Sequence, residues 1–182
     1  MNMFEYVFQD TRLIYKKSSF IHNCTRYFLI PSYNILVNYR LCQYVRNSRW
    51  GCLIGWYFRY RLRRKQTKFL VDFDDCLECG PGLFFPHNGP FVINGHAKIG
   101  KRCTIHPNVL IGGDRGKGVP IIGDYVFIGN GAKIIGDVKV GDWVFISPAA
   151  VVTKDIPSGA VVGAGLNKIL SNNGKEHVNM YL

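Results

Sequence analysis

The chain of 182 residues lacks several features that would each indicate a particular class of protein. It has no long apolar run, because its two most hydrophobic stretches, 28–37 and 50–58, are each about half the length that spans a bilayer. It does not open on a basic segment followed by an apolar core, as a secretory signal peptide does. Its six cysteines follow no disulfide-scaffold spacing. We therefore expect a reduced, cytoplasmic protein.

The cysteines also give little support for a metal site. Cys76 and Cys79 form a single C-x-x-C pair, whereas zinc sites built on such a pair need further ligands at a matching spacing. We interpret the thiols as buried or surface groups. The sequence therefore predicts no metal cofactor.

Acidic residues are scarce in the first 70 positions, which hold 2 Asp and Glu against 13 Lys and Arg, while the remainder holds 10 of each. The same segment contains 16 of the 25 aromatic residues. Charge alone therefore places a boundary near Val71. We divide the chain into a basic, aromatic, mostly helical segment (1–70), a repeat domain (71–166) and a tail (167–182).

Two helices are expected in the basic segment, one from Pro31 to about Arg46 and one from Trp50 to Lys65. Aromatic residues beside Lys and Arg suit peripheral contact with anionic lipid, here the inner leaflet of a bacterial plasma membrane. The alternative is that the aromatics pack on the repeat domain or on a neighbouring subunit. Nucleic acid is a third reading, but no binding motif supports it, and we expect no such partner.

Aliphatic residues recur at a strict step of six through the second part of the chain. A step of six matches neither the 3.6-residue period of a helix nor the two-residue period of a strand. It fits a chain that turns a corner every six residues, with the aliphatic side chain inside and Gly, Asn or Asp at the bend. Three sides make an 18-residue triangular coil, and such coils stack about 4.8 Å apart. The repeating residues are Val71, Leu77, Leu83, Ile93, Ile99, Ile105, Ile111, Ile122, Ile128, Ile134, Val140, Ile146 and Val152.

Two breaks in this period predict loops. Leu83 to Ile93 contains four residues more than the period allows, and Ile111 to Ile122 contains five more. Residues added to a rigid solenoid must leave it as loops, and loops on rigid scaffolds often carry function. The first loop holds Pro86-His87-Asn88-Gly89-Pro90, and the second holds the glycine-rich stretch 112–118.

Several stretches match a known family. Val71-Asp72 followed by Gly80-Pro-Gly-Leu-Phe-Phe-Pro-His87 resembles V-D-I…G-x-G-I-x-x-D-H, Ile111-Gly-Gly resembles L-G-G, and 128–136 resembles I-G-A-G-A-K-I-L-G. Residues 71–170 thus resemble the left-handed β-helix acyltransferases. The likeness is nearest to the serine acetyltransferase branch and to the capsule and O-antigen acetyltransferases grouped with it. The fold class expected is mainly β, a left-handed parallel β-helix of hexapeptide repeats with an α-helical N-terminal segment.

The resemblance implies a homotrimer with its active site between adjacent subunits and acetyl-CoA lying along the coil. By position in the family's pattern, His87 is the general base and Asp72 orients it. An unperturbed imidazole is also the side chain best matched to deprotonating a hydroxyl near neutral pH. Asp72 lies fifteen residues before His87, near one coil's length, so we expect the two to meet. His96 and His106 fall at outward positions and are expected to be surface residues.

The remaining candidate site residues follow from the two loops and from the matched stretches. We expect the donor to contact close-approach backbone and lysines near its phosphates. The predicted cofactor-binding residues are Gly112, Gly113, Lys117, Gly131, Ala132, Ala149 and Lys168. The predicted acceptor-binding residues are Asn88 and Arg115.

Departures from the serine enzymes bear on the acceptor. The aspartate directly before their histidine is Pro86 here, their second histidine corresponds to Val119, and their large helical domain is missing. A zwitterion needs charged partners at both ends, since unpaired polar groups in a closed site are costly. We therefore expect O-acetylation of a sugar hydroxyl in a surface polysaccharide or its precursor, with serine as the alternative acceptor.

Further alternatives stay open. The same histidine could serve N-acetylation of an amino sugar, and the coil could be a non-catalytic scaffold. A γ-type carbonic anhydrase shares the coil and binds zinc through three histidines, but the coil histidines here are spaced nine and ten residues apart, unlike that family's pattern.

Overall fold

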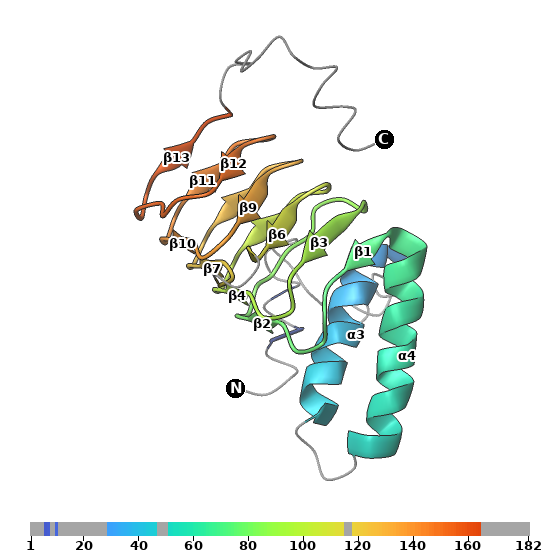
Figure 1. Ribbon diagram of the computed structural model, residues 1–182. Helices are drawn as coiled ribbons and strands as arrows, with labels where there is room; N and C mark the ends of the chain where they lie inside the picture. Colours follow the sequence, from blue (N-terminus) through green and yellow to red (C-terminus); the bar gives the residue numbers. More distant parts are fainter. Residues whose placement is uncertain (1–5, 8–9, 11–28, 47–50, 115–117, 165–182) are drawn as a thin grey trace, which may run out of the picture.

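The computed structural model describes residues 6–7, 10, 29–46, 51–114 and 118–164, with only the backbone of 51–53. Two helices, α3 (Pro31–Arg46) and α4 (Gly51–Phe69), precede a stack of short strands and lie at its first end (Figure 1). The expected helices are confirmed, with α4 running to Phe69. The strands are β1 (Val71–Asp72), β2 (Glu78–Cys79), β3 (Phe91–Ile93), β4 (Lys98–Ile99), β5 (Thr104–Ile105), β6 (Leu110–Gly112), β7 (Ile121–Ile122), β8 (Phe127–Ile128), β9 (Lys133–Ile135), β10 (Lys139–Val140), β11 (Phe145–Ile146), β12 (Val151–Val152) and β13 (Val161–Val162).

Three parallel sheets form the sides of a triangular coil. Face A is the sheet β1-β3-β6-β9-β12, face B is β2-β4-β7-β10, and face C is β5-β8-β11-β13. Successive strands along the chain enter different sheets, and each pairs with the strand one coil away. This is the predicted β-helix of hexapeptide repeats, and the fold class is confirmed.

The strand register corrects the phase predicted for the first coil. Val71 pairs with Phe91, so this coil has two residues more than the 18 between Val92 and its partner Leu110. The prediction of four extra residues is wrong. Each side of the coil buries two positions, and in the first coil both hold bulky side chains, so the six-residue period fits Val71, whereas the structure places Phe73 in line with Ile93. The five extra residues of the second loop are confirmed, because Leu110 pairs with Lys133.

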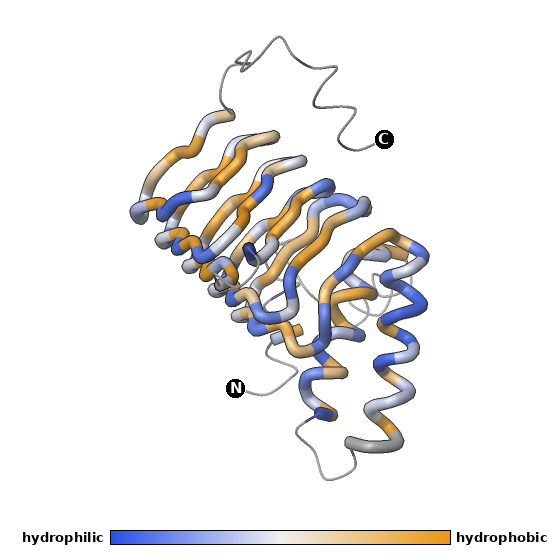
Figure 2. The backbone as a smooth tube through the Cα atoms, in the orientation of Figure 1, coloured by the Kyte–Doolittle hydropathy of each residue, from blue (hydrophilic) through white to orange (hydrophobic). Residues whose placement is uncertain are grey.

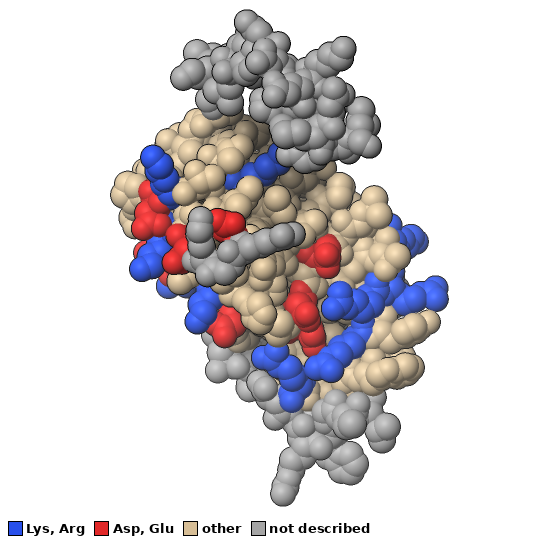
Figure 3. Space-filling model, viewed as in Figure 1, with Lys and Arg blue, Asp and Glu red and all other residues tan. Residues whose placement is uncertain are grey.

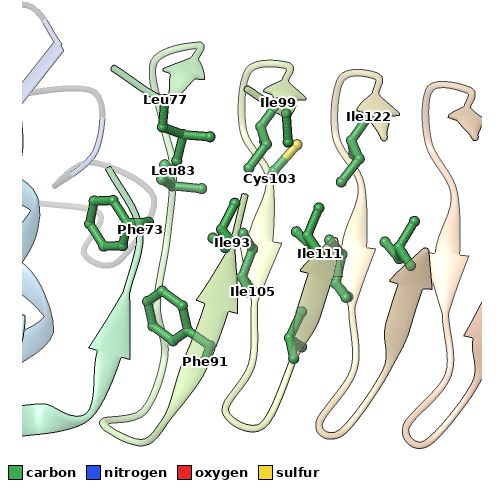
Figure 4. Close-up of a cluster of buried hydrophobic side chains, with 14 of the residues drawn as sticks. Phe73, Leu77, Leu83, Phe91, Ile93, Ile99, Cys103, Ile105, Ile111 and Ile122 are labelled. Atoms are coloured by element: carbon green, nitrogen blue, oxygen red, sulfur yellow. The ribbon is translucent and has the colours of Figure 1, made fainter. Parts of the chain in front are cut away.

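The interior is a continuous column of apolar side chains, to which each coil contributes residues from all three faces (Figure 4). Hydrophobic residues recur along the backbone of every coil (Figure 2). Small residues are needed where neighbouring coils touch. A Cβ at Gly129 would lie 2.5 Å from the backbone nitrogen of Pro148 on the next coil, closer than atoms can approach. The glycines after the aliphatics therefore hold the coils at their spacing.

The two helices continue this core. Ile35, Leu36 and Tyr39 of α3 are buried in the same apolar cluster as the coil. Tyr39 donates its hydroxyl proton to the carbonyl of Leu77, and Gln66 of α4 donates to the carbonyl of Phe73 at 2.6 Å. The helices therefore close the first end of the coil, where carbonyl groups and apolar side chains would otherwise face water.

A buried ion pair fastens the beginning of the chain to the same end. Arg40 of α3 donates from Nε to Oδ2 of Asp10 at 3.0 Å, and both side chains are almost fully buried. Arg40 also donates to the carbonyls of Cys79 and Gly80, while Asp10 accepts from the backbone N–H of Gly82 and Leu83. These contacts fix the chain just before the His87 loop.

Candidate active site

His87 projects from the first coil on a short, well-anchored loop. Phe85, two residues earlier, is buried against Phe91, with ring centroids 4.6 Å apart. His87 itself is exposed and borders a narrow pocket whose apolar wall includes Ile35 and Val71. The extra residues of the coil therefore lift an imidazole to the surface from a rigid base.

Asn88, predicted to bind the acceptor, makes a structural contact. Its Oδ1 accepts a hydrogen bond of 3.1 Å from the backbone N–H of Ser32, in the first turn of α3. That N–H has no partner within the helix, so Asn88 caps α3 from 56 residues away in the sequence. The loop that carries His87 is thereby tied to α3. A role for Asn88 in acceptor binding stays a prediction.

His106 is a neighbour of His87 that the sequence reasoning missed. The two ring centroids lie 5.8 Å apart, and His106 also contacts Phe127, whose ring stacks on Phe145 at 4.6 Å. Burial, and then the adjacent His87, lower the pKa of His106. His106 therefore favours the neutral form beside the candidate base. The sequence contained a signal for this contact, since His87 and His106 are 19 residues apart and one coil takes 18 to 20 residues.

Asp72 does not meet His87 in the protomer. Its side chain is exposed on face A, beside a shallow groove that includes Arg63 and Asn94. Within the described ranges no hydrogen bond joins Asp72 to His87, and the recorded ring partner of His87 is His106. Fifteen residues fall short of this 20-residue coil, so the two positions lie on different parts of one turn. The orienting role of Asp72 stays a prediction.

Two of the predicted donor residues lie on the same edge of the coil as His87. Asn108, Gly131 and Ala149 occupy equivalent corners between faces C and A, and all three have left-handed backbone angles, with φ of 60°, 72° and 59°. The N–H of each donates to a carbonyl of the preceding coil, and for Asn108 that carbonyl belongs to Pro90 of the His87 loop. We call this line the corner column. The corner column begins at the His87 loop and runs parallel to the axis of the coil.

Ala132, next to this column, has neither an exposed side chain nor an unbonded backbone group with which to contact a ligand. Its side chain is fully buried, its N–H donates to Gly129, and its carbonyl accepts from Leu110. Gly131 is more open, because a Cβ there would have no backbone neighbour closer than 3.9 Å. An extended ligand could therefore approach the chain closely at Gly131.

The second loop lies at the opposite edge of face A. Gly112 ends β6, and a bridge between Asp114 and Gly118 closes the base of the loop. Gly113 packs against that bridge, since a Cβ there would lie 2.8 Å from the carbonyl oxygen of Gly118. One protomer therefore keeps Gly112 and Gly113 apart from His87, with the width of face A between them. The predicted Arg115, Lys117 and Lys168 lie outside the described residues.

The described residues contain no cluster of three or more His, Cys, Asp or Glu side chains arranged to bind a metal ion. His96 is exposed on the coil, as expected. Cys42 and Cys103 are buried, which raises the pKa of each thiol to about 12 and disfavours the thiolate that binds metals.

Comparison with known proteins agrees with this geometry. Residues 120–154 match the family model described as bacterial transferase hexapeptide (six repeats). The chain is 34% identical over 142 residues to a serine acetyltransferase of Helicobacter pylori, and the alignment covers 75% of this chain and 80% of that protein. It belongs to the serine acetyltransferase-like hexapeptide acyltransferases.

Solved structures of this family extend the match. Isoform 3 of serine acetyltransferase from Entamoeba histolytica, in complex with cysteine, covers 97% of this chain and 64% of its own, with a TM-score of 0.73 and 24% identity. A serine acetyltransferase in complex with CoA covers 72% and 54%, with a TM-score of 0.61 and 26% identity. The chain thus spans about half to two thirds of these structures. A match over 97% of the chain takes in α3 and α4 as well as the coil.

Proposed function

We propose that this acyltransferase transfers the acetyl group of acetyl-CoA to the hydroxyl of L-serine. The observation that carries the proposal is the 34% identity to a serine acetyltransferase across 80% of that protein's length. The aligned region is long enough to include the His87 loop together with most of the coil. Serine is therefore favoured over the sugar hydroxyl that the sequence alone suggested.

In the proposed reaction His87 is the general base. Its free ring nitrogen takes the hydroxyl proton as the serine oxygen attacks the thioester carbonyl of acetyl-CoA. The tetrahedral intermediate then collapses, the carbon–sulfur bond breaks, and His87 returns the proton to the departing CoA sulfur. The products are O-acetylserine and CoA. His87 can serve in this way because its ring is exposed at the surface.

His106 has a supporting part in this mechanism. Two imidazolium ions at this separation would repel each other, and burial already favours the neutral form of His106. A neutral ring there avoids that repulsion while His87 carries the proton taken from serine. The Phe127 ring, which contacts His106, adds an apolar group beside the site, which would help to exclude water from the thioester.

The donor is proposed to lie along the corner column. The backbone is open at Gly131, and Ala149 follows one coil further from His87. This placement orients the thioester toward the base and the nucleotide end of CoA away from it. Lys168 is proposed to contact the phosphates as a point charge.

The active molecule is proposed to be a homotrimer. One protomer holds His87 at one edge of face A and Gly112 and Gly113 at the other. A neighbouring copy can bring its second loop beside His87 and so complete the site. Arg115 and Lys117 of that loop would then be placed to contact the acceptor carboxylate and CoA.

A sugar hydroxyl is the second candidate acceptor, and the observation that favours it is Pro86. The serine-enzyme pattern places an aspartate directly before the histidine, where it would hold the substrate's amino group. Proline offers no charge at that position. The base and donor site would serve either acceptor without change.

The test is an assay of CoA release with purified protein, acetyl-CoA and either L-serine or nucleotide sugars. We expect turnover with L-serine, and we expect His87→Ala to lower kcat about 10²–10⁴-fold. The matched control is His96→Ala, which removes an exposed imidazole from the next coil. Turnover with a sugar and none with serine would refute the acceptor, and a normal rate in His87→Ala would refute the base.

A further inference from the structure

The outward side of α4 has a composition that neither the coil nor the site explains. The helix carries six Lys and Arg residues and no Asp or Glu. Two of these cations pair with acids of the first coil, Arg59 with Asp75 at 2.7 Å and Arg63 with Asp74 at 3.8 Å. Arg64, Lys65 and Lys68 form no ion pair with any acid in the part of the chain that the structure describes.

Aromatic side chains share this surface with the cations. Trp56 is 70% exposed, and its ring stacks on Tyr60 one turn later, with centroids 5.8 Å apart. Tyr60 in turn accepts a hydrogen bond from Arg64 at 3.3 Å, and the guanidinium lies 5.9 Å from the phenol ring. Trp56, Tyr60 and Arg64 therefore form a stripe along the helix at a spacing of four residues.

The exposed aromatic residues come before the three cations that lack an acidic partner. Exposed Trp56, Tyr57 and Tyr60 occupy the first half, and exposed Arg64 and Lys68 occupy the second half. Figure 3 shows Lys and Arg side chains gathered over α4, with uncharged surface beside them. The inner side of the helix is already occupied, since Leu62 is buried and a Cβ at Gly55 would lie 3.6 Å from the side chain of Val45 on α3.

We propose that this outward side of α4 docks the protein on the surface of an anionic lipid bilayer. Charge complementarity carries the inference, because cations without acidic partners face the solvent and anionic headgroups supply the missing charge. The aromatics favour a lipid surface over other polyanions. Indole and phenol rings beside cations suit the headgroup layer, where one end of each ring is apolar and the other is wet.

The attachment is peripheral and reversible. None of the described helices is both long enough and apolar enough to cross a bilayer. Each Lys or Arg near an anionic surface raises affinity about fivefold. Removing Arg64, Lys65 and Lys68 together should therefore weaken binding on the order of 100-fold. Salt should also release the protein, since the Debye length falls to about 3 Å at about 1 M.

The experiment is co-sedimentation of the full-length protein with vesicles of phosphatidylglycerol and phosphatidylcholine, compared with vesicles of phosphatidylcholine alone. We expect binding to the anionic vesicles at low salt and release at high salt. The triple variant R64Q/K65Q/K68Q should lose binding. The matched control K98Q/K139Q/K154Q removes the same charge from exposed lysines of the coil and should keep it. The double variant W56A/Y60A should bind less tightly without any change in net charge.

Thermal unfolding of each variant distinguishes a lost surface from a lost fold, because all the substituted residues lie at the surface. Equal binding by the two triple variants would show that overall charge is responsible and would overturn the proposal. So would tighter binding to DNA than to vesicles at equal phosphate concentration. A fall in oligomeric mass on replacing Trp56 and Tyr60, with vesicle binding kept, would assign the surface to contacts between copies. None of these measurements depends on serine being the acceptor.

Discussion

Arg40 offers the sharpest test of how the helical segment is joined to the coil. Its guanidinium is 2% exposed and its partner Asp10 is 1% exposed, so the pair lies outside bulk water. Every hydrogen-bond partner recorded for the Asp10 side chain is a donor, which fits an ionised carboxylate. Replacing Arg40 with Met would leave that carboxylate buried without a counter-charge. The carbonyls of Cys79 and Gly80 would also lose a donor.

We expect Arg40→Met to lower the free energy of unfolding by about 3–5 kcal/mol, the usual result of removing one partner of a buried pair. Domains of this size have a total stability of about 5–15 kcal/mol, so the change is large. The assay is urea unfolding followed by circular dichroism at fixed protein concentration, since an oligomer's stability depends on concentration. Asp10→Asn combined with Arg40→Met should cost less than the two single changes added together. A loss below about 1 kcal/mol, or strict additivity, would refute the reasoning.

The same variant should respond to pH in a defined direction. Burial raises the pKa of Asp10, while Arg40 and the amides of Gly82 and Leu83 oppose the rise. Without Arg40 the folded state favours the protonated acid still more. The loss of stability in Arg40→Met is therefore largest where Asp10 is ionised, and it shrinks as the pH falls through the pKa of that acid. A loss that is equal at pH 7 and pH 4 would contradict this account.

Three further predictions concern the site. Asp72→Asn should reduce kcat by less than His87→Ala does, because it disturbs only the orientation of the imidazole, and an unchanged kcat would remove Asp72 from the mechanism. Asn88→Ala should lower the free energy of unfolding by about 1 kcal/mol through loss of the α3 cap, while Asn88→Asp keeps an acceptor for Ser32 and should be nearly neutral by thermal unfolding. The pKa of His106 is lowered, so the free energy of unfolding should fall as the pH drops below about 6.5, because the unfolded chain then takes up a proton that the folded state resists. His106→Gln should make that fall smaller in urea unfolding curves recorded over a series of pH values.

The fold was predictable because burial repeats with the geometry of the coil. Ile128, Ile134, Val140 and Ile146 are all buried, on faces C, A, B and C in turn, and their step of six residues shows that the chain turns at regular corners. The phase of the first coil was not predictable by the same rule. Val71 and Phe73 are both buried there, so a period of six fits either residue. Only the pairing of β1 with β3 distinguishes them.

The site was predictable in part, and the missing pieces are those set by distances across coils. His87 is recognisable from its loop and its family pattern. Its contact with His106 depends on how an insertion of two residues places the first coil over the second. The cap that Asn88 places on α3 joins residues that no local pattern links. Contacts between copies, on which the proposed role of the second loop depends, cannot be derived from the order of residues in one chain.

The corner column that joins the His87 loop to Asn108, Gly131 and Ala149 also sets fixed distances along the edge of the coil. Each step along it is one coil, about 4.8 Å, and each is fixed by a backbone hydrogen bond rather than by side chains. The span from the loop to Ala149 is thus about 14 Å, set by the number of coils alone. Substitutions on the outward faces leave that span unchanged, whereas deleting a whole 18-residue coil beyond Gly131 shortens it by one step. The length of this edge is therefore counted in whole coils, and it changes only when a coil is gained or lost.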